Sequence, residues 1–140
     1  MNNPDCIFCG IISGRIPCTK IFENQSVLAF LDIHPAAEGH VLVVPKTHVE
    51  RIDQADGQVL SEIGKVLPKL TGAVKKAIQA DGYNVLCNNG PASGQAVGHL
   101  HFHIIPRKTG DNVMKPWKPI EYHSGRLQQI EQKINAELVL

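Results

Sequence analysis

The feature that most constrains the fold is a run from His99 to Ile105 in which histidines and apolar residues alternate. Side chains of a β-strand point alternately to its two faces. The three histidines would therefore share one face, while Leu100, Phe102 and Ile104 face a core. The run predicts a strand over residues 100–105 that carries a row of imidazoles.

Three interpretations of this row are open. A solvated strand face would explain it, although three imidazoles are an unusual choice for a purely structural strand because burying them without partners is costly. A catalytic three-histidine zinc site needs converging imidazoles, whereas residues two apart on a strand lie about 7 Å apart. Relayed chemistry fits better, because a neutral imidazole is a good nucleophile and a neighbour can fix its tautomer or move a proton.

Four other segments are predicted to be strands because they are short, apolar and mostly rich in β-branched residues. They are Thr19–Phe22, Val27–Leu31, His40–Val44 and Tyr83–Cys87. Strands interrupted by a single long helix indicate an α+β domain with an antiparallel sheet of about five strands. The alternation in the last strand further predicts that one face of this sheet is wet.

One long helix is predicted from Val59 to Ile78, where apolar residues recur at helical spacing and lysines lie off the apolar stripe. Asp56 is a suitable N-cap, and Asp81-Gly82 is expected to stop the helix. Pro68 lies inside the run and should kink or split it. Two shorter helical segments are expected, at Cys6–Ser13 and Ser124–Leu138.

Composition argues against several classes of partner. Lys plus Arg number 14 and Asp plus Glu 13, so the chain lacks the basic excess with which duplex-binding proteins neutralise phosphates, and no nucleic acid partner is expected. No apolar run approaches the roughly 20 residues needed to cross a bilayer, and the start lacks the pattern of a secretory signal. These features predict a cytoplasmic protein with no membrane partner, and 140 residues suit one domain.

A second candidate site begins at Cys6 and Cys9, whose Cys-x-x-Cys spacing can place two thiolates on one metal. A redox pair competes with this interpretation, but the preceding βαβ context of such pairs is missing. Two reduced cysteines without a ligand remain the third possibility. Two further metal ligands would have to come from distant parts of the chain, and Cys18 and Cys87 are expected to be packed thiols.

The loop directly before the histidine run, residues 88–98, contains three glycines, two asparagines and a glutamine. Exposed backbone N–H groups in such a loop can wrap an anion without a lysine. Its position against the histidine strand predicts a phosphate site.

The histidine run resembles the signature of the histidine-triad (HIT) family, and Gly94-Gln95 with Val97 matches the usual lead-in. The blocks Asp32–Pro35 and Gly39–His48 are similar to earlier blocks of that family. The resemblance runs from about Cys6 to Arg107 and favours the Hint-like nucleotide phosphoramidate hydrolases, in their zinc-binding bacterial-type form. It implies one HIT domain over residues 1–140, a HIT-like α+β fold and a homodimer.

The resemblance also implies a site for a purine nucleoside monophosphate. By position, His101 would attack phosphorus, His103 would contact the phosphate and His40 would support the central histidine. Asp32 would hold the ribose hydroxyls and Ile33 would lie against the base or sugar. The positions expected on the phosphate side are Asn88, Gly94 and Gln95, followed by Ala96 where enzymes of this branch carry a serine near the leaving group.

Some bacterial-type members complete a zinc site with a histidine after the Pro-Lys block and with the first triad histidine, here His48 and His99. The implied zinc ligands are Cys6, Cys9, His48 and His99. Four protein ligands make a closed site, which is typical of structural zinc.

The implied activity is that of a nucleotidyl hydrolase or transferase that forms a covalent nucleotidyl-histidine on His101. A dinucleoside polyphosphate hydrolase would share this chemistry. A nucleotide-binding interaction module with incidental activity, or a zinc-dependent hydrolase, would also carry residues of these types.

Overall fold

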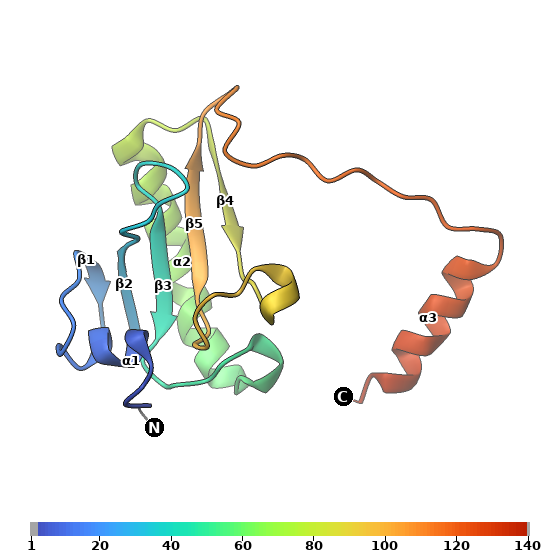
Figure 1. Ribbon diagram of the computed structural model, residues 1–140, viewed down its shortest axis with the longest axis horizontal. Helices are drawn as coiled ribbons and strands as arrows, with labels where there is room; N and C mark the ends of the chain where they lie inside the picture. The colour runs from blue at the N-terminus through green and yellow to red at the C-terminus, as the bar shows by residue number, and fades with distance from the viewer. Residues whose placement is uncertain (1–2, 140) are drawn as a thin grey trace.

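A five-stranded antiparallel sheet forms the centre of the protein, with strand order β1-β2-β3-β5-β4 (Figure 1). The computed structural model describes residues 3–139. The strands are β1 (Lys20–Glu23), β2 (Val27–Leu31), β3 (Val41–Pro45), β4 (Gly82–Leu86) and β5 (Phe102–Arg107). The helices are α1 (Ile7–Ile12), α2 (Gly57–Ile78) and α3 (Arg126–Glu137), with short 3-10 turns at Ile52–Gln54 and Pro91–Ser93. This architecture confirms the predicted α+β class.

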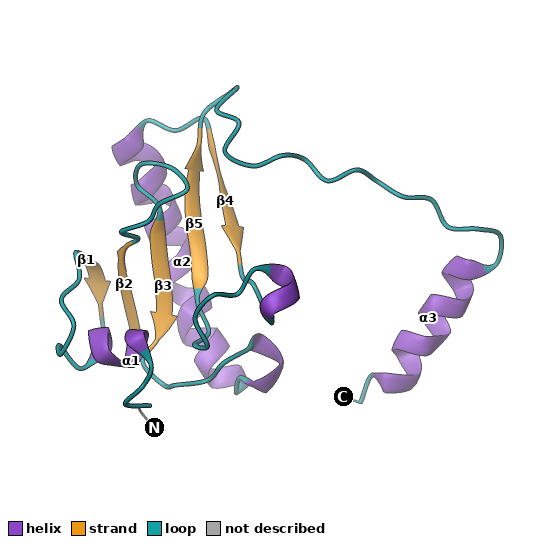
Figure 2. Cartoon of the chain, in the orientation of Figure 1, coloured by secondary structure: helices purple, strands orange, loops and turns teal. Residues whose placement is uncertain are grey.

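The long helix α2 covers one face of the sheet (Figure 2). Asp56 caps its first turn, as predicted, because its carboxylate accepts a hydrogen bond from Gln58 N at 2.7 Å. Its apolar stripe packs on the inward residues of β2, β3 and β5, and burial of this stripe supplies the main hydrophobic stabilisation. The buried members of this cluster are Val27, Ala29, Val41, Val43, Ile63, Val66, Leu70, Val74 and Ile104.

The sequence predicted that the face opposite α2 is wet, and over β2 and β3 this prediction was wrong. The short helix α1 and the N-terminal segment cover that half of the sheet, so that both strands are buried on both sides. The second core cluster contains Cys6, Phe8, Cys9, Leu28, Phe30, Leu42 and Val44. The helix α1 is only six residues long, with one cysteine inside it and another at its N-cap, and the pattern of the strands alone does not say where so short an apolar helix packs.

The alternation of the histidine run is confirmed, although the strand begins two residues later than predicted. Ile104 pairs with Val41 and faces α2, whereas His103 pairs with Leu42 and faces the other side. The ladder with β3 ends at Phe102, so the residues just before it have no strand partner. Leu100 instead donates its N–H to the carbonyl of Val49 at 2.6 Å.

The long helix α2 is confirmed, but two details of its sequence act differently from the expectation. Pro68 does not split the helix. It has no N–H to donate to the carbonyl of Gly64, but both residues are exposed, so water can replace the missing hydrogen bond. The helix ends at Ile78, as predicted, but it is stopped by Gln79, which adopts the left-handed conformation with φ 54°, and not by Asp81-Gly82. The N–H of Asp81 bonds to the carbonyl of Arg107 at 2.9 Å and already belongs to the approach to β4.

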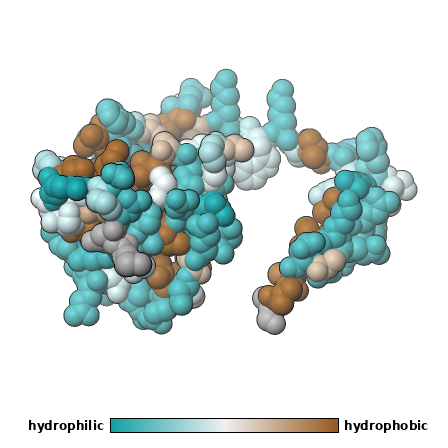
Figure 3. All heavy atoms as spheres, turned by 60° about the horizontal axis from the view of Figure 1, so that its bottom comes forward, coloured by the Kyte–Doolittle hydropathy of each residue, from teal (hydrophilic) through white to brown (hydrophobic). Residues whose placement is uncertain are grey.

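The C-terminal helix α3 lies apart from the sheet, at the end of an extended segment (Figure 1). It confirms the predicted terminal helix, but none of its residues is buried. Apolar side chains form a stripe along it (Figure 3). No helix in the described part of the chain is long and apolar enough to span a membrane.

Gly39, directly before the site residue His40, is expected to tolerate no side chain. Its φ is +89°, and a Cβ there would lie 2.5 Å from Cγ1 of Ile78. Backbone strain and overpacking should together make Gly39→Ala less stable by at least about 2 kcal/mol. Denaturant unfolding measures this change.

Gly64→Ala is the matched control, because Gly64 is an exposed interior position of α2 with open space around it. Its helix propensity should stabilise the protein by up to about 1 kcal/mol. Equal stability changes in the two variants would contradict the role assigned to Gly39.

Candidate active site and metal centre

The central histidine of the run, His101, is held in one tautomer. Its Nδ1 lies 2.6 Å from the carbonyl oxygen of His99. A carbonyl oxygen only accepts hydrogen bonds, so Nδ1 carries the proton and Nε2 carries the lone pair. Burial lowers the pKa of His101, which keeps the ring neutral at neutral pH. A neutral imidazole with a free Nε2 lone pair is a nucleophile.

A second pair of histidines forms a hydrogen-bonded chain beside it. The N–H of Ala36 donates to Nδ1 of His40 at 3.0 Å, so the proton of a neutral His40 lies on Nε2. That Nε2–H donates to Nδ1 of His103 at 2.9 Å, which places the proton of His103 on its own Nε2. The Asp32 carboxylate lies 3.8 Å from Nε2 of His40. The backbone thus determines the tautomers of both rings.

The end of this chain, Nε2–H of His103, is left without a partner. It is the only buried side-chain nitrogen or oxygen among residues 3–139 that lacks a hydrogen bond. Burial, followed by the nearby His101 and His40, lowers the pKa of His103 to about 4, so the ring is neutral at pH 7. An unpaired buried donor is costly, and such a group in a native structure often marks the place of a ligand.

The lone pair of His101 and the free donor of His103 are neighbours, because the two ring centroids lie 4.9 Å apart. A group that offers an electrophilic centre and an adjacent anionic oxygen would satisfy both. A phosphoryl group has these features, since displacement at phosphorus needs a nucleophile and donors for the surrounding oxygens.

The first histidine of the run, His99, does not share this site. Its Nδ1 lies 3.4 Å from Sγ of Cys6 and 3.6 Å from Sγ of Cys9. His48 completes the group, with its Nδ1 3.3 Å from Sγ of Cys9 and 3.2 Å from Nδ1 of His99. The catalytic zinc site formed by all three histidines of the run is therefore excluded, because His99 turns to the cysteines.

The four side chains Cys6, Cys9, His48 and His99 fit a tetrahedral metal. Their ligand atoms lie within 4.8 Å of one another. Zinc bonds of about 2.0 Å to nitrogen and 2.3 Å to sulfur would separate tetrahedral ligand atoms by about 3.3–3.8 Å, close to the distances found. Burial raises the pKa of the Cys9 thiol, so a bound metal would have to displace its proton.

The tautomer of His99 is independent evidence for this fit. Its Nε2 lies 2.8 Å from the carbonyl oxygen of Pro45 and must donate to it, which leaves the Nδ1 lone pair directed at the thiols. Metal-binding histidines usually tie their other ring nitrogen to a carbonyl or carboxylate in this way. The group of Asp32, His40 and His103 also lies close together, but its histidines are already hydrogen-bonded.

The glycine-rich loop is braced by Gln95. Its Oε1 accepts from Gly90 N at 2.7 Å, and its Nε2 donates to Glu50 O at 2.8 Å and to Val97 O at 3.1 Å. Both ends of the Gln95 side-chain amide are thus hydrogen-bonded to backbone groups, two in the loop and one at Glu50. Gln95 therefore has a structural role that the sequence did not indicate.

The remaining predicted nucleotide-binding residues lie around the histidines or on the surface. Asn88 follows β4, whose Leu86 pairs with His103, and a Cβ on Gly94 would lie 3.6 Å from Asn88 Nδ2. Ala96 is exposed and lines a depression of about 300 Å³ beside α1. Ile33 is 80% exposed and contributes nothing to the core.

Sequence reasoning missed Phe8, which packs against His101 with ring centroids 5.1 Å apart. The signal that could have found it is its place between two predicted metal ligands. The backbone groups of Ala36 and Pro45 that set the histidine tautomers were missed as well, because they leave no side-chain signal in the sequence.

An antiparallel sheet that presents paired imidazoles beside a glycine-rich loop defines a histidine-triad type of protein. The chain belongs to the HIT family: the family model described as the HIT domain matches residues 13–110. An uncharacterized HIT-like protein of Methanocaldococcus jannaschii is 51% identical over 76% of this chain and 81% of its own length. The adenosine 5'-monophosphoramidase HNT1 of Candida albicans is 40% identical over 98% of this chain and 93% of its own.

Solved structures agree with the fold. A Streptococcus mutans protein superimposes with a TM-score of 0.92 at 38% identity, covering 96% of this chain and 86% of its own. A histidine-triad family protein of Mycobacterium smegmatis, described as zinc-bound, has a TM-score of 0.74 at 33% identity, covering 96% and 98%.

Metal content tests the cysteine–histidine cluster. We expect about one zinc per chain in the purified protein and strong loss of zinc in Cys9→Ser, because a closed site needs all four ligands. Elemental analysis of the purified proteins measures this. Cys18→Ser is the control, since Cys18 lies outside the cluster and should keep the metal. Equal zinc content in both variants would disprove the site.

Proposed function

We propose that this protein hydrolyses phosphoramidate derivatives of purine nucleoside 5'-monophosphates through a covalent nucleotidyl-histidine on His101. The observation that carries the proposal is the free Nε2 lone pair of His101 beside the unpartnered Nε2–H of His103. The name of the Candida relative supports the substrate class.

In the first step, Nε2 of His101 attacks phosphorus in line with the bond to the leaving amine. The P–Nε2 bond forms and the P–N bond to the amine breaks, while His103 donates its free N–H to a phosphoryl oxygen. The amine must leave with a proton, supplied by a histidine or by the phosphoryl group itself.

In the second step, water attacks the same phosphorus: a P–O bond forms, the P–Nε2 bond breaks, and the proton released by the water replaces the one that left with the amine. Nucleoside monophosphate leaves, and the neutral His101 is restored with its Nδ1–H still bonded to His99 O. The hydrogen bond from His40 keeps the free donor of His103 in place through both steps.

The nucleotide itself would extend away from the two rings. Asp32, close to His40, suits the ribose hydroxyls, and the exposed Ile33 suits the base or sugar. Asn88 and Gly94 suit the phosphate side of the site. Ala96 in place of a serine offers no hydroxyl to the leaving group, so any selectivity for the leaving group must come from other residues of the site.

Zinc at Cys6, Cys9, His48 and His99 would tie the N-terminal segment to the sheet and contribute folding free energy. All four positions are protein ligands, so the proposal gives the metal no contact with substrate. A zinc-dependent hydrolase would instead lose activity on chelation without any loss of fold.

A dinucleoside polyphosphate hydrolase is the second candidate activity, because the same rings could displace a phosphate leaving group. Steady-state rates on an adenosine phosphoramidate and on a diadenosine polyphosphate would separate the two. A nucleotide-binding interaction module would bind the nucleotide, and its hydrolysis of the nucleotide would have no role in the cell.

The covalent intermediate can be detected directly. After mixing with adenosine 5'-phosphoramidate and quenching, intact-mass analysis should show an adenylyl adduct that maps to His101. His101→Ala should lose the adduct and reduce kcat by at least about 10³-fold, since the nucleophile is removed. His34→Ala is the control, because His34 is exposed and should keep both adduct and rate. An adduct retained in His101→Ala would refute the mechanism.

We further infer that two copies of the chain form a homodimer. β4 is an edge strand, and its Tyr83 and Val85 are exposed on one face. Exposed edges of this kind are usually covered, and a two-fold pairing would cover them. The projecting α3, with exposed Leu127 and Ile134, could then contact the second copy.

Light scattering on a sizing column tests the dimer. Val85→Asp places a charge on the proposed interface and should shift the protein toward monomer by at least about tenfold in dissociation constant. Ile21→Asp is the matched control on the other edge strand, β1, where the side chain is similarly exposed. A monomeric wild type, or equal effects of the two substitutions, would contradict the assignment.

A further inference from the structure

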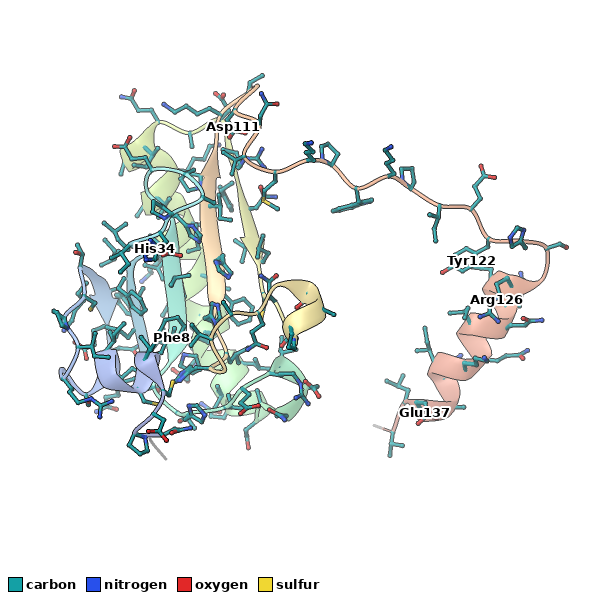
Figure 4. All side chains as sticks on the ribbon, in the orientation of Figure 1. Phe8, His34, Asp111, Tyr122, Arg126 and Glu137 are labelled. Carbon is teal, nitrogen blue, oxygen red and sulfur yellow. The ribbon has the colours of Figure 1, made fainter. Side chains whose placement is uncertain are left out.

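Phe8 connects two sites that are separate in chemistry. It lies in α1 between Cys6 and Cys9, where the helix meets the sheet (Figure 4). Its ring is buried and stands edge-to-face against the ring of His101, with centroids 5.1 Å apart and an interplanar angle of 84°. The same ring contacts His99 with centroids 5.9 Å apart.

The position of Phe8 depends on the cysteine pair. A helix of six residues is too short to be stable by itself. Its N-cap is Cys6, whose sulfur accepts a hydrogen bond from Cys9 N at 3.4 Å. Whatever holds the two sulfurs therefore also holds the ring between them.

A second contact runs from the same cluster to His101. His99 is fixed through Nε2 by Pro45 O and through Nδ1 by its place among the thiols. Its own carbonyl oxygen is the acceptor for His101 Nδ1 at 2.6 Å. His101 is thus held by its hydrogen bond to His99 and by its perpendicular contact with Phe8.

We propose that Phe8 is a positioning residue for His101, and that Phe8 and the His99 carbonyl couple metal binding at the cysteine–histidine cluster to the orientation of the nucleophile. The inference deepens the proposed function and rests on it for the role of His101. Coupling of this kind is reciprocal, so the fixed orientation of His101 would also strengthen metal binding.

The physical basis is restriction of ring rotation. If the His101 ring turned over, its Nδ1 would leave the carbonyl of His99, and its Nε2 would exchange places with a ring carbon. Phe8 fills one side of the ring and opposes this motion through an edge-to-face contact. Without zinc, or without the aromatic ring of Phe8, the His101 ring should populate more than one orientation.

The experiment measures the tautomer and orientation of His101 directly, without substrate. Imidazole nitrogen NMR on histidine-labelled protein, with the His101 signals assigned by their loss in His101→Ala, should show a single Nδ1–H form in the zinc-loaded wild type. Phe8→Leu should keep the zinc but show a mixed population, with the Nδ1–H form reduced several-fold relative to the other. Chelated wild type should move in the same direction.

Phe30→Leu is the matched control. Phe30 is also buried, belongs to the same core cluster and contacts Phe8 at 5.6 Å between centroids. It should lose comparable stability and keep the single His101 form. If a general loosening of the core were responsible, the two variants would give the same mixed signals, and the proposal would be overturned.

A rate measurement adds a second readout. At saturating substrate, adduct formation on His101 should slow about tenfold in Phe8→Leu, because the reacting atoms are less well oriented. Phe8→Met, a flexible apolar side chain of similar size, replaces Phe8→Leu if the latter does not fold by circular dichroism.

A single unchanged His101 form in the Phe8 variant and in chelated protein would refute the coupling. This result is distinct from a failure of the proposed function. If the wild type forms no nucleotidyl adduct but its tautomer responds to zinc and to Phe8, the coupling stands and the reaction is wrong.

Discussion

The hydrogen bond from His101 Nδ1 to the carbonyl of His99 is the contact on which the site depends. It assigns the proton of the ring and thereby frees the other nitrogen for chemistry. A side-chain acceptor could rotate away or titrate, but a backbone carbonyl fixed on both sides by the chain does neither. The run of alternating histidines thus provides both the proposed nucleophile and, two residues earlier, the carbonyl group that holds its ring.

The two faces of the sheet are used differently, and this explains where a polar site can exist. α2 seals one face with aliphatic side chains, while α1 covers only β2 and β3 on the other. On the second face, imidazoles occupy only the start of β5 and the position just before it, at His103 and His101. The ring nitrogens of His40, His101 and His103 are hydrogen-bonded to backbone or to one another except at Nε2 of His101 and Nε2 of His103. Only His103 Nε2 is buried without a partner, so the cost of burying these rings falls mainly on that atom.

Much of this could be predicted from the sequence because the signals were local. Strand period, helix period and the N-cap at Asp56 follow from neighbouring residues, and each is confirmed within a few positions. The metal group was also predicted, but its distant members His48 and His99 came from family resemblance and not from spacing.

The features that could not be predicted depend on tertiary contacts. The burial of β2 and β3 on both faces requires knowing where α1 packs, and the intact helix at Pro68 requires knowing that the affected carbonyl faces water. The tautomers of His40 and His99 are set by the backbone of Ala36 and Pro45, which any residue could supply. The contact of Phe8 with His101 joins distant parts of the chain and has no sequence pattern of its own.

The long separation between the metal ligands has a consequence for biosynthesis. Cys6 and His99 stand 93 residues apart, so a growing chain cannot close the cluster until most of the domain has left the ribosome. Until then the cluster lacks the imidazole of His99. Metal capture would therefore come late, after the strands have begun to pair, and would act as a final lock on an assembled domain instead of as a nucleus for it.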